Sequence, residues 1–70
     1  MIKYFYATDY GNDDQKLSAF TKKATRDNFV DCGNRRYATT RIDADRLSKN
    51  TYGCCAKGAA TKGYIREDTQ

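Results

Sequence analysis

Apolar and polar positions alternate over two short stretches at the start of the chain. In residues 2–8, aromatic and aliphatic side chains recur at every second position, which is the repeat of a pleated strand. A turn-forming cluster occupies residues 9–14, and residues 16–20 alternate again. A hairpin is the simplest connection over a loop of this length. We therefore predict two antiparallel strands, at residues 2–8 and 16–20.

The period then changes to that of a helix. Thr21 is a good N-cap residue, because its hydroxyl can accept from the free backbone N–H groups of a first turn. Apolar side chains follow at helical spacing, and Gly33 can take the left-handed conformation that closes a helix. We predict a helix over residues 22–32. An alternative begins this helix at Ser18, since the end of the second strand also fits a helical face.

The middle of the chain predicts one more strand and one more helix. Residues 35–42 alternate and are rich in Thr and Tyr, which favour strands. Asp43 is a plausible N-cap for a short helix over residues 44–50. Asp45 falls in the first turn of that helix and Lys49 in its last, which is the charge order that the helix dipole favours.

The last third is harder to interpret. Residues 51–61 are small and punctuated by glycine, which is consistent with a loop or with one turn of helix around residues 54–57. Residues 62–67 alternate and predict a final strand. The predicted order is β-β-α-β-α-β, an α+β fold in which a small antiparallel or mixed sheet carries its helices on one face.

Composition limits the size and setting of this fold. Seventy residues form one domain, residues 1–70, and a chain this short buries roughly 60% of its unfolded surface. Six Tyr and three Phe with a net charge of only +4 argue against disorder. We see neither a signal peptide nor an apolar run of the ~20 residues that span a bilayer. Three cysteines, an odd number, suit a reducing compartment. We expect a cytoplasmic protein without membrane contact.

Few residues could support catalysis or bind a metal. Histidine is absent, so histidine-based nucleophile and general-base schemes are excluded. Cys54 and Cys55 lie near Lys57, which could stabilise a thiolate, but buried or incidental thiols are the favoured interpretation. Asp13 and Asp14 resemble half of a weak cation site and lack the bidentate Glu of a calcium loop. We predict a protein that is not an enzyme and has no cofactor and no metal.

Basic and tyrosine side chains are the best remaining feature. They could bind phosphate groups and bases, or they could anchor a protein interface, which prefers Tyr and Arg. Aspartates interrupt the cluster, so a solvated surface of mixed sign is the alternative interpretation. The predicted partner-binding residues are Lys22, Lys23, Arg26, Arg35, Arg36, Tyr37, Arg41, Arg46 and Tyr52.

The chain resembles a pattern of small phage and prophage accessory proteins over about two thirds of its length. The resemblance rests on the strand-like residues 3–7, on the stretch FTKKATRDNFV at residues 20–30, and on residues 36–42 leading into an acidic helix start at 43–47. Residues 54–61 have no counterpart in this pattern.

The resemblance implies a function as well as a fold. Small phage proteins of this size commonly block a host system by binding it, as the anti-CRISPR inhibitors do. Our first hypothesis is a non-enzymatic inhibitor, acting in the host cytoplasm, that binds a host protein or ribonucleoprotein complex such as a CRISPR-Cas effector. The alternative is a small basic protein that contacts nucleic acid directly through its Lys, Arg and Tyr side chains.

Overall fold

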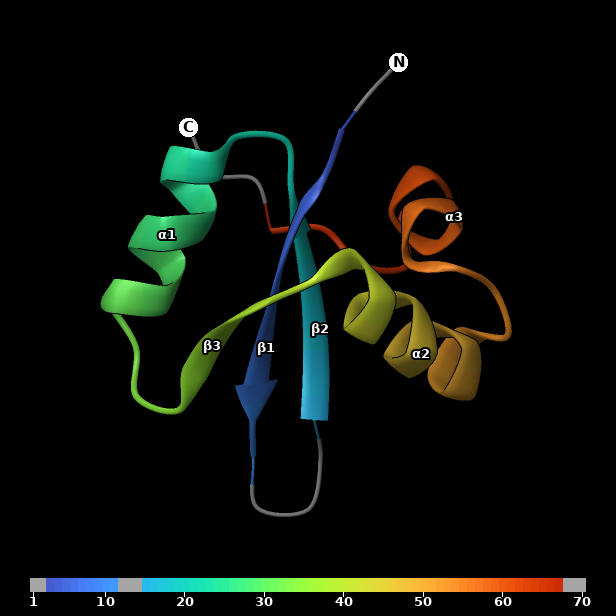
Figure 1. Ribbon diagram of the computed structural model, residues 1–70, viewed down its shortest axis with the longest axis horizontal. Helices are drawn as coiled ribbons and strands as arrows, with labels where there is room; N and C mark the ends of the chain where they lie inside the picture. Colours follow the sequence, from blue (N-terminus) through green and yellow to red (C-terminus); the bar gives the residue numbers. More distant parts are fainter. Residues whose placement is uncertain (1–2, 12–14, 68–70) are drawn as a thin grey trace.

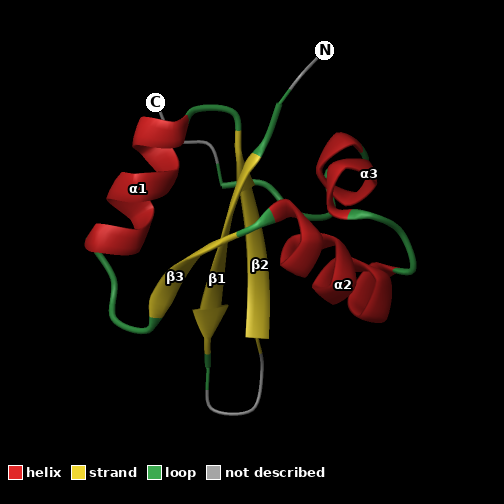
Figure 2. Ribbon diagram, in the orientation of Figure 1, coloured by secondary structure: helices red, strands yellow, loops and turns green. Residues whose placement is uncertain are grey.

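The computed structural model describes residues 3–11 and 15–67 and has an α+β fold. Three antiparallel strands form one sheet in the order β2-β1-β3, and three helices surround it (Figure 1, Figure 2). The elements are β1 (Phe5–Tyr10), β2 (Gln15–Phe20), α1 (Lys23–Asp31), β3 (Arg36–Thr39), α2 (Arg41–Tyr52) and α3 (Ala56–Thr61).

The first two strands form the predicted antiparallel pair. Phe5 lies opposite Phe20 at one end of the ladder, and Tyr10 lies opposite Gln15 at the other. The structure extends β1 to Tyr10, two residues beyond the predicted end, because the turn-forming residues Asp9 and Tyr10 still pair across the sheet. Asp13 and Asp14, which the sequence did not support as a calcium site, lie outside the described residues. Residues 15–20 belong to β2, which rules out a helix beginning at Ser18.

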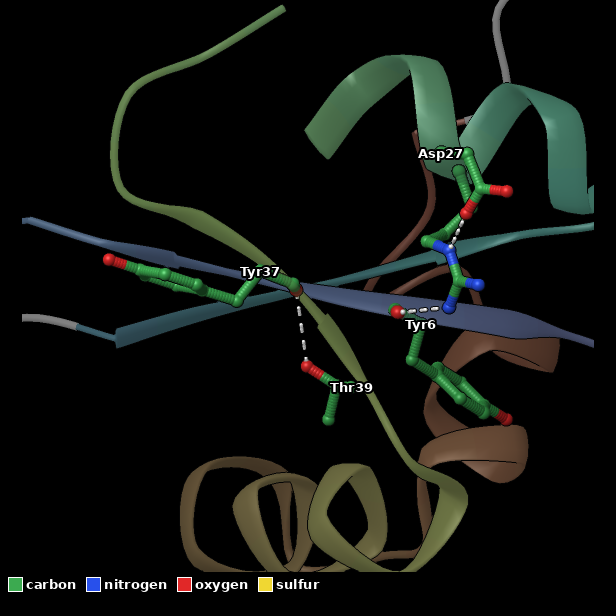
Figure 3. Close-up of polar contacts among 5 residues, drawn as sticks. Tyr6, Asp27, Tyr37 and Thr39 are labelled. Atoms are coloured by element: carbon green, nitrogen blue, oxygen red, sulfur yellow. Dashed lines mark hydrogen bonds and ion pairs between the residues drawn. The ribbon is translucent and has the colours of Figure 1, made fainter. Parts of the chain in front are cut away.

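Helices cover both faces of the sheet, whereas the sequence suggested one face. On one face, Phe29 of α1 packs against Phe20, with ring centroids 5.1 Å apart. On the other face, α2 and α3 enclose a core that includes Tyr4 and Tyr6. Figure 3 shows α1 on one side of the sheet and α2 with α3 on the opposite side. The physical reason is that both faces of β1 are apolar, so each face needs a cover.

Alanines bring α2 and α3 close to the sheet. Ala44, Ala56, Ala59 and Ala60 are almost completely buried in the core cluster, where Leu17 and Ile65 join them. A methyl side chain allows a helix backbone to approach its neighbour closely, so a thin core is closed with few large aliphatic residues. The sequence had left this alanine-rich part unassigned.

The ends of α1 differ from the prediction. The N-cap residue is Lys22, which makes no side-chain capping hydrogen bond, so the prediction of Thr21 as the cap is wrong. Gly33 is also not left-handed. Among the described residues, Arg35 is the non-glycine residue with a positive φ, at 64°. A Cβ atom at Gly33 would overlap the Arg36 side chain, so this glycine provides space for that arginine.

The second helix begins earlier than predicted. Its N-cap is Thr40, whose hydroxyl oxygen accepts from the backbone N–H of Asp43 at 3.3 Å, so Asp43 belongs to the first turn. Residues 40–42 were predicted as strand, and the cap at Thr40 ends β3 before them. Ile42 is consequently 66% exposed on the helix. Gly53 ends α2 with a φ of 77°.

The predicted last strand is replaced by a helix end. The backbone N–H groups of Gly63 and Tyr64 donate to the carbonyl oxygens of Ala60 and Ala59, which closes α3 in a Schellman motif. The chain then runs back to β2, where the Glu67 N–H donates to the Ala19 carbonyl at 3.2 Å. Residues 62–67 are therefore not a strand, because their first half terminates the helix. None of the described helices is both long enough and apolar enough to span a bilayer.

Candidate partner-binding surface

Two of the predicted binding residues are used inside the fold. Arg26 reaches from α1 to the sheet, where its Nη1 donates to the Tyr6 carbonyl at 3.1 Å and its Nε lies 2.7 Å from an Asp27 carboxylate oxygen (Figure 3). Its side chain is only 12% exposed. Arg26 therefore holds α1 against β1.

Arg36 has a similar role at the other end of α1. Its guanidinium lies 4.1 Å from the centroid of the Phe29 ring, and its Nη1 donates to the Phe29 carbonyl at 3.1 Å. Its Nε is also 3.7 Å from a carboxylate oxygen of Asp9. These contacts connect α1, β1 and β3, so Arg36 offers little of its charge to a partner.

Other predicted residues come together along β3. We define the β3 surface as Tyr10, Arg35, Tyr37, Ala38 and Arg46. All five side chains are exposed, and the Tyr10 and Tyr37 rings meet edge to face at 5.4 Å. Beside the rings, a cavity of about 430 Å³ lies between this strand and α2. The surface therefore combines two aromatic rings, two arginines and a hollow.

The backbone at this surface is also open. β3 is an edge strand, because it pairs only with β1 among the described elements (Figure 2). The opposite edge, β2, has a partner at Ala19, which accepts from Glu67. An open edge presents backbone donors and acceptors that another chain can pair with.

Arg35 fixes the beginning of the open edge. Its carbonyl accepts from the Tyr10 N–H at 3.1 Å, so the left-handed residue itself extends the β1–β3 ladder. A positive φ is uncommon for a residue with a side chain and is found often at functional sites. Arg35 thereby projects from a defined backbone position next to Tyr10 and Tyr37.

The arginine on the helical side is only loosely paired. Nη1 of Arg46 lies 3.5 Å from a carboxylate oxygen of Asp43, and the two side chains are 72% and 57% exposed. An exposed pair of this kind contributes about 0–1 kcal/mol, so a partner can displace it at small cost. Arg46 remains available for binding.

The remaining predicted residues lie elsewhere. Lys22 and Lys23 are exposed at the start of α1, and Arg41 lines a separate cavity between α2 and α3. Tyr52, at the end of α2, stacks on Tyr64 with ring centroids 5.6 Å apart. The predicted set is therefore divided among several parts of the molecule. Sequence reasoning missed Tyr10, and only the β1–β3 register places that residue beside Tyr37.

The described part of the chain brings no three candidate metal ligands together. Its three cysteines are free thiols, and the Sγ of Cys55 accepts from the Gly58 N–H at 3.4 Å as the N-cap of α3. This hydrogen bond gives the Cys55 thiol a structural role at the start of α3.

Comparison with known proteins adds no relative. No protein-family model, no curated protein and no solved structure matches this chain. The resemblance to phage accessory proteins stays a prediction, and the case for a function depends on the surface geometry.

Proposed function

We propose that this protein is a non-enzymatic inhibitor that docks on a host defence or nucleic-acid-processing complex, such as a CRISPR-Cas effector, through its β3 surface. The observation that carries the proposal is the edge-to-face pair of Tyr10 and Tyr37, 39% and 54% exposed, beside an open strand edge. Exposed aromatic rings next to arginine are typical of the energetic centres of protein interfaces.

Two further features support docking on an acidic protein or ribonucleoprotein. Arg35 is joined to Tyr10 through the backbone, and Arg46 lines the cavity together with Asp43. Two arginines against one carboxylate leave a positive charge, which attracts negative charge. The strand edge offers main-chain hydrogen bonds to an extended segment of the partner, and the adjacent cavity offers a place for a side chain. Affinity would come from the rings and the edge, and orientation from the arginines.

Phage plating tests this function directly. Bacteria that carry a defined CRISPR-Cas system and a matching spacer restrict a targeted phage, and expression of this protein should restore plating in at least one system type. A Tyr37→Ala, Arg35→Glu double variant should restore much less, at equal expression. Unchanged restriction across a panel of system types, together with no binding to the purified effectors, would refute the proposal.

A second candidate, direct binding to nucleic acid, is favoured by Lys22 and Lys23. Both are exposed, and neither forms an ion pair with any residue that the structure describes. Phosphate binding weakens steeply as salt rises, whereas an interface anchored by tyrosine does not. Gel shifts with single- and double-stranded DNA and RNA over a salt series separate the two candidates. A shift that disappears with salt and with Lys22→Gln, Lys23→Gln supports the second candidate.

A further inference from the structure

A second cavity lies on the side of the sheet that α2 and α3 cover. Its volume is about 400 Å³, within the range of small-molecule sites. Tyr4 and Tyr6 contribute to its wall, Asp45 reaches it from the N-terminal half of α2, and Cys55 reaches it from the N-cap of α3. It shares no lining residue with the cavity of the β3 surface.

The charge around this cavity is unbalanced. Lys3, Arg41 and Lys57 line it, against the single carboxylate of Asp45. Among the described residues, none of these three cations forms an ion pair, in contrast to Arg26, Arg36 and Arg46. Asp45 is also partly engaged, because one of its oxygens accepts from the Ala56 N–H at 2.9 Å. The ammonium of Lys3 lies 5.6 Å from the centroid of the Phe5 ring, so Arg41 and Lys57 supply the excess of positive charge, which favours an anionic occupant.

The hydroxyl of Tyr6 suits the same kind of occupant. Burial, with the negative charge of Asp45 as a secondary cause, raises its pKa to about 12. The group therefore stays neutral near pH 7, adds no negative charge to the cavity and keeps a proton to donate.

We propose that this cavity is a binding site for nucleoside 5′-monophosphates. The phosphate is held by Arg41 and Lys57, and the base and sugar lie against the wall formed by Tyr4 and Tyr6. Asp45 accepts a hydrogen bond from a ligand hydroxyl or amino group. A nucleotide fits better than a simple anion, because the cavity combines cations with tyrosine rings and one acceptor.

Alkylation of the cysteines provides the assay. Cys55 lines the cavity and is exposed, whereas Cys32 is exposed at the end of α1 and serves as an internal control. Purified protein is treated with iodoacetamide, with and without AMP, GMP, CMP or UMP at millimolar concentration. Fragmentation mass spectrometry then follows each thiol separately. At least one nucleotide should slow labelling of Cys55 severalfold and leave Cys32 unchanged.

Variants and ligand fragments identify the interactions responsible. Arg41→Gln should weaken nucleotide binding in calorimetry roughly tenfold, the worth of one charge-assisted hydrogen bond. Lys49→Gln is the matched control, because it removes an exposed cation from the same helix outside the cavity and should leave binding unchanged. Circular dichroism melts show whether both variants fold.

Each outcome decides a part of the proposal. Protection of Cys55 by a nucleotide, but by neither the nucleoside nor inorganic phosphate, supports it. Equal protection by the nucleoside overturns the role of the cations, and equal protection by inorganic phosphate overturns the role of the rings. No protection by any nucleotide, or equal protection of Cys32, overturns the site.

Discussion

Arginine at neighbouring positions of this chain has opposite roles. The guanidinium of Arg36 stacks on the Phe29 ring and donates to the Phe29 carbonyl, so Arg36 joins α1 to the sheet. Arg35 differs by one position, has a positive φ and is exposed. Residue type alone could not predict which of the two arginines is exposed, because this depends on the conformation of the turn between α1 and β3.

Ser48 shows how a single buried atom can limit stability. It is completely buried in α2, and its hydroxyl oxygen is the one buried side-chain polar atom without a hydrogen-bond partner in the described part of the chain. Burying an unsatisfied polar group costs about 1–3 kcal/mol.

We therefore expect Ser48→Ala to raise the free energy of unfolding by about 1 kcal/mol. Alanine removes the unpaired hydroxyl, and it is the better helix former. Urea unfolding followed by circular dichroism measures the change. Ser48→Val, which refills the volume and adds a methyl group to a tightly packed site, should not stabilise. A lower unfolding free energy for Ser48→Ala would mean that the hydroxyl does have a partner.

Tyr6 gives the fold a sensitivity to alkaline pH. Its pKa lies at about 12 in the folded state against an ordinary value of 10.0, chiefly because of burial. Below pH 10 both the folded and the unfolded chain keep the Tyr6 proton, so the contribution of this group to the free energy of unfolding is at its full value. Between pH 10 and about 12 the unfolded chain releases the proton and the folded chain retains it, so stability falls as pH rises.

Tyr6→Phe should remove this contribution. Wild type should lose stability more steeply than the variant over that interval, because the variant has no proton to release at this position. Urea unfolding at several pH values from neutral to alkaline compares the two slopes. If both proteins lose stability in parallel, the Tyr6 hydroxyl does not titrate as the structure indicates.

At the scale of elements, short polar contacts define where α2 and α3 begin. Thr40 caps α2 by accepting from the Asp43 N–H, and Cys55 caps α3 by accepting from the Gly58 N–H. Asp45 adds a third contact by accepting from the Ala56 N–H, which ties α2 to α3. These contacts place the two helices that cover Tyr4 and Tyr6.

Thr40→Ala should lower the free energy of unfolding by about 1 kcal/mol, because it leaves a first-turn N–H without its acceptor. Thr40→Ser retains the hydroxyl and should stay close to wild type. Thermal melts of the three proteins measure the difference. A Ser variant as unstable as the Ala variant would show that the hydroxyl is not what matters at this position.

The sequence predicted five of the six elements and left the region of the last helix open, as a loop or as one turn of helix around residues 54–57. Alternation marked β1, β2 and β3, helical spacing marked α1, and a capping residue with a favourable charge order marked α2. The helix α3 was not predicted because its buried face consists of alanines, which carry little hydrophobic signal. The pattern of residues 62–67 suggested a strand, but Gly63 and Tyr64 are used to close that helix.

The candidate site was predicted less completely than the fold. Tyr37 and Arg46 line one cavity, Arg35 lies just before β3, and the sequence named all three. The inward orientation of Arg26 and Arg36 was not predicted, because the groups that they contact lie elsewhere in the sequence, at Tyr6 and Phe29. Tyr10 was missed for the same reason, since its place beside Tyr37 depends on strand register.

At the scale of the molecule, two layers of helices leave one edge of the sheet open. α1 covers one face, and α2 with α3 cover the other, so the residues that we propose to bind a partner lie along the open edge at β3 (Figure 1). The nucleotide cavity that we propose lies on the α2 and α3 side and uses different residues. The two sites can therefore be tested independently.

A comparison of Tyr37→Ala with Tyr64→Ala tests the role of the β3 surface most directly. Both tyrosines are 54% exposed, so the variants remove equal exposed rings at different places. Labelled protein is titrated with purified CRISPR-Cas effector complexes, and the affinity is measured by fluorescence anisotropy. Tyr37→Ala should bind at least about tenfold more weakly than wild type, and Tyr64→Ala should bind as wild type does. Equal affinities for the two variants would contradict docking through the β3 surface.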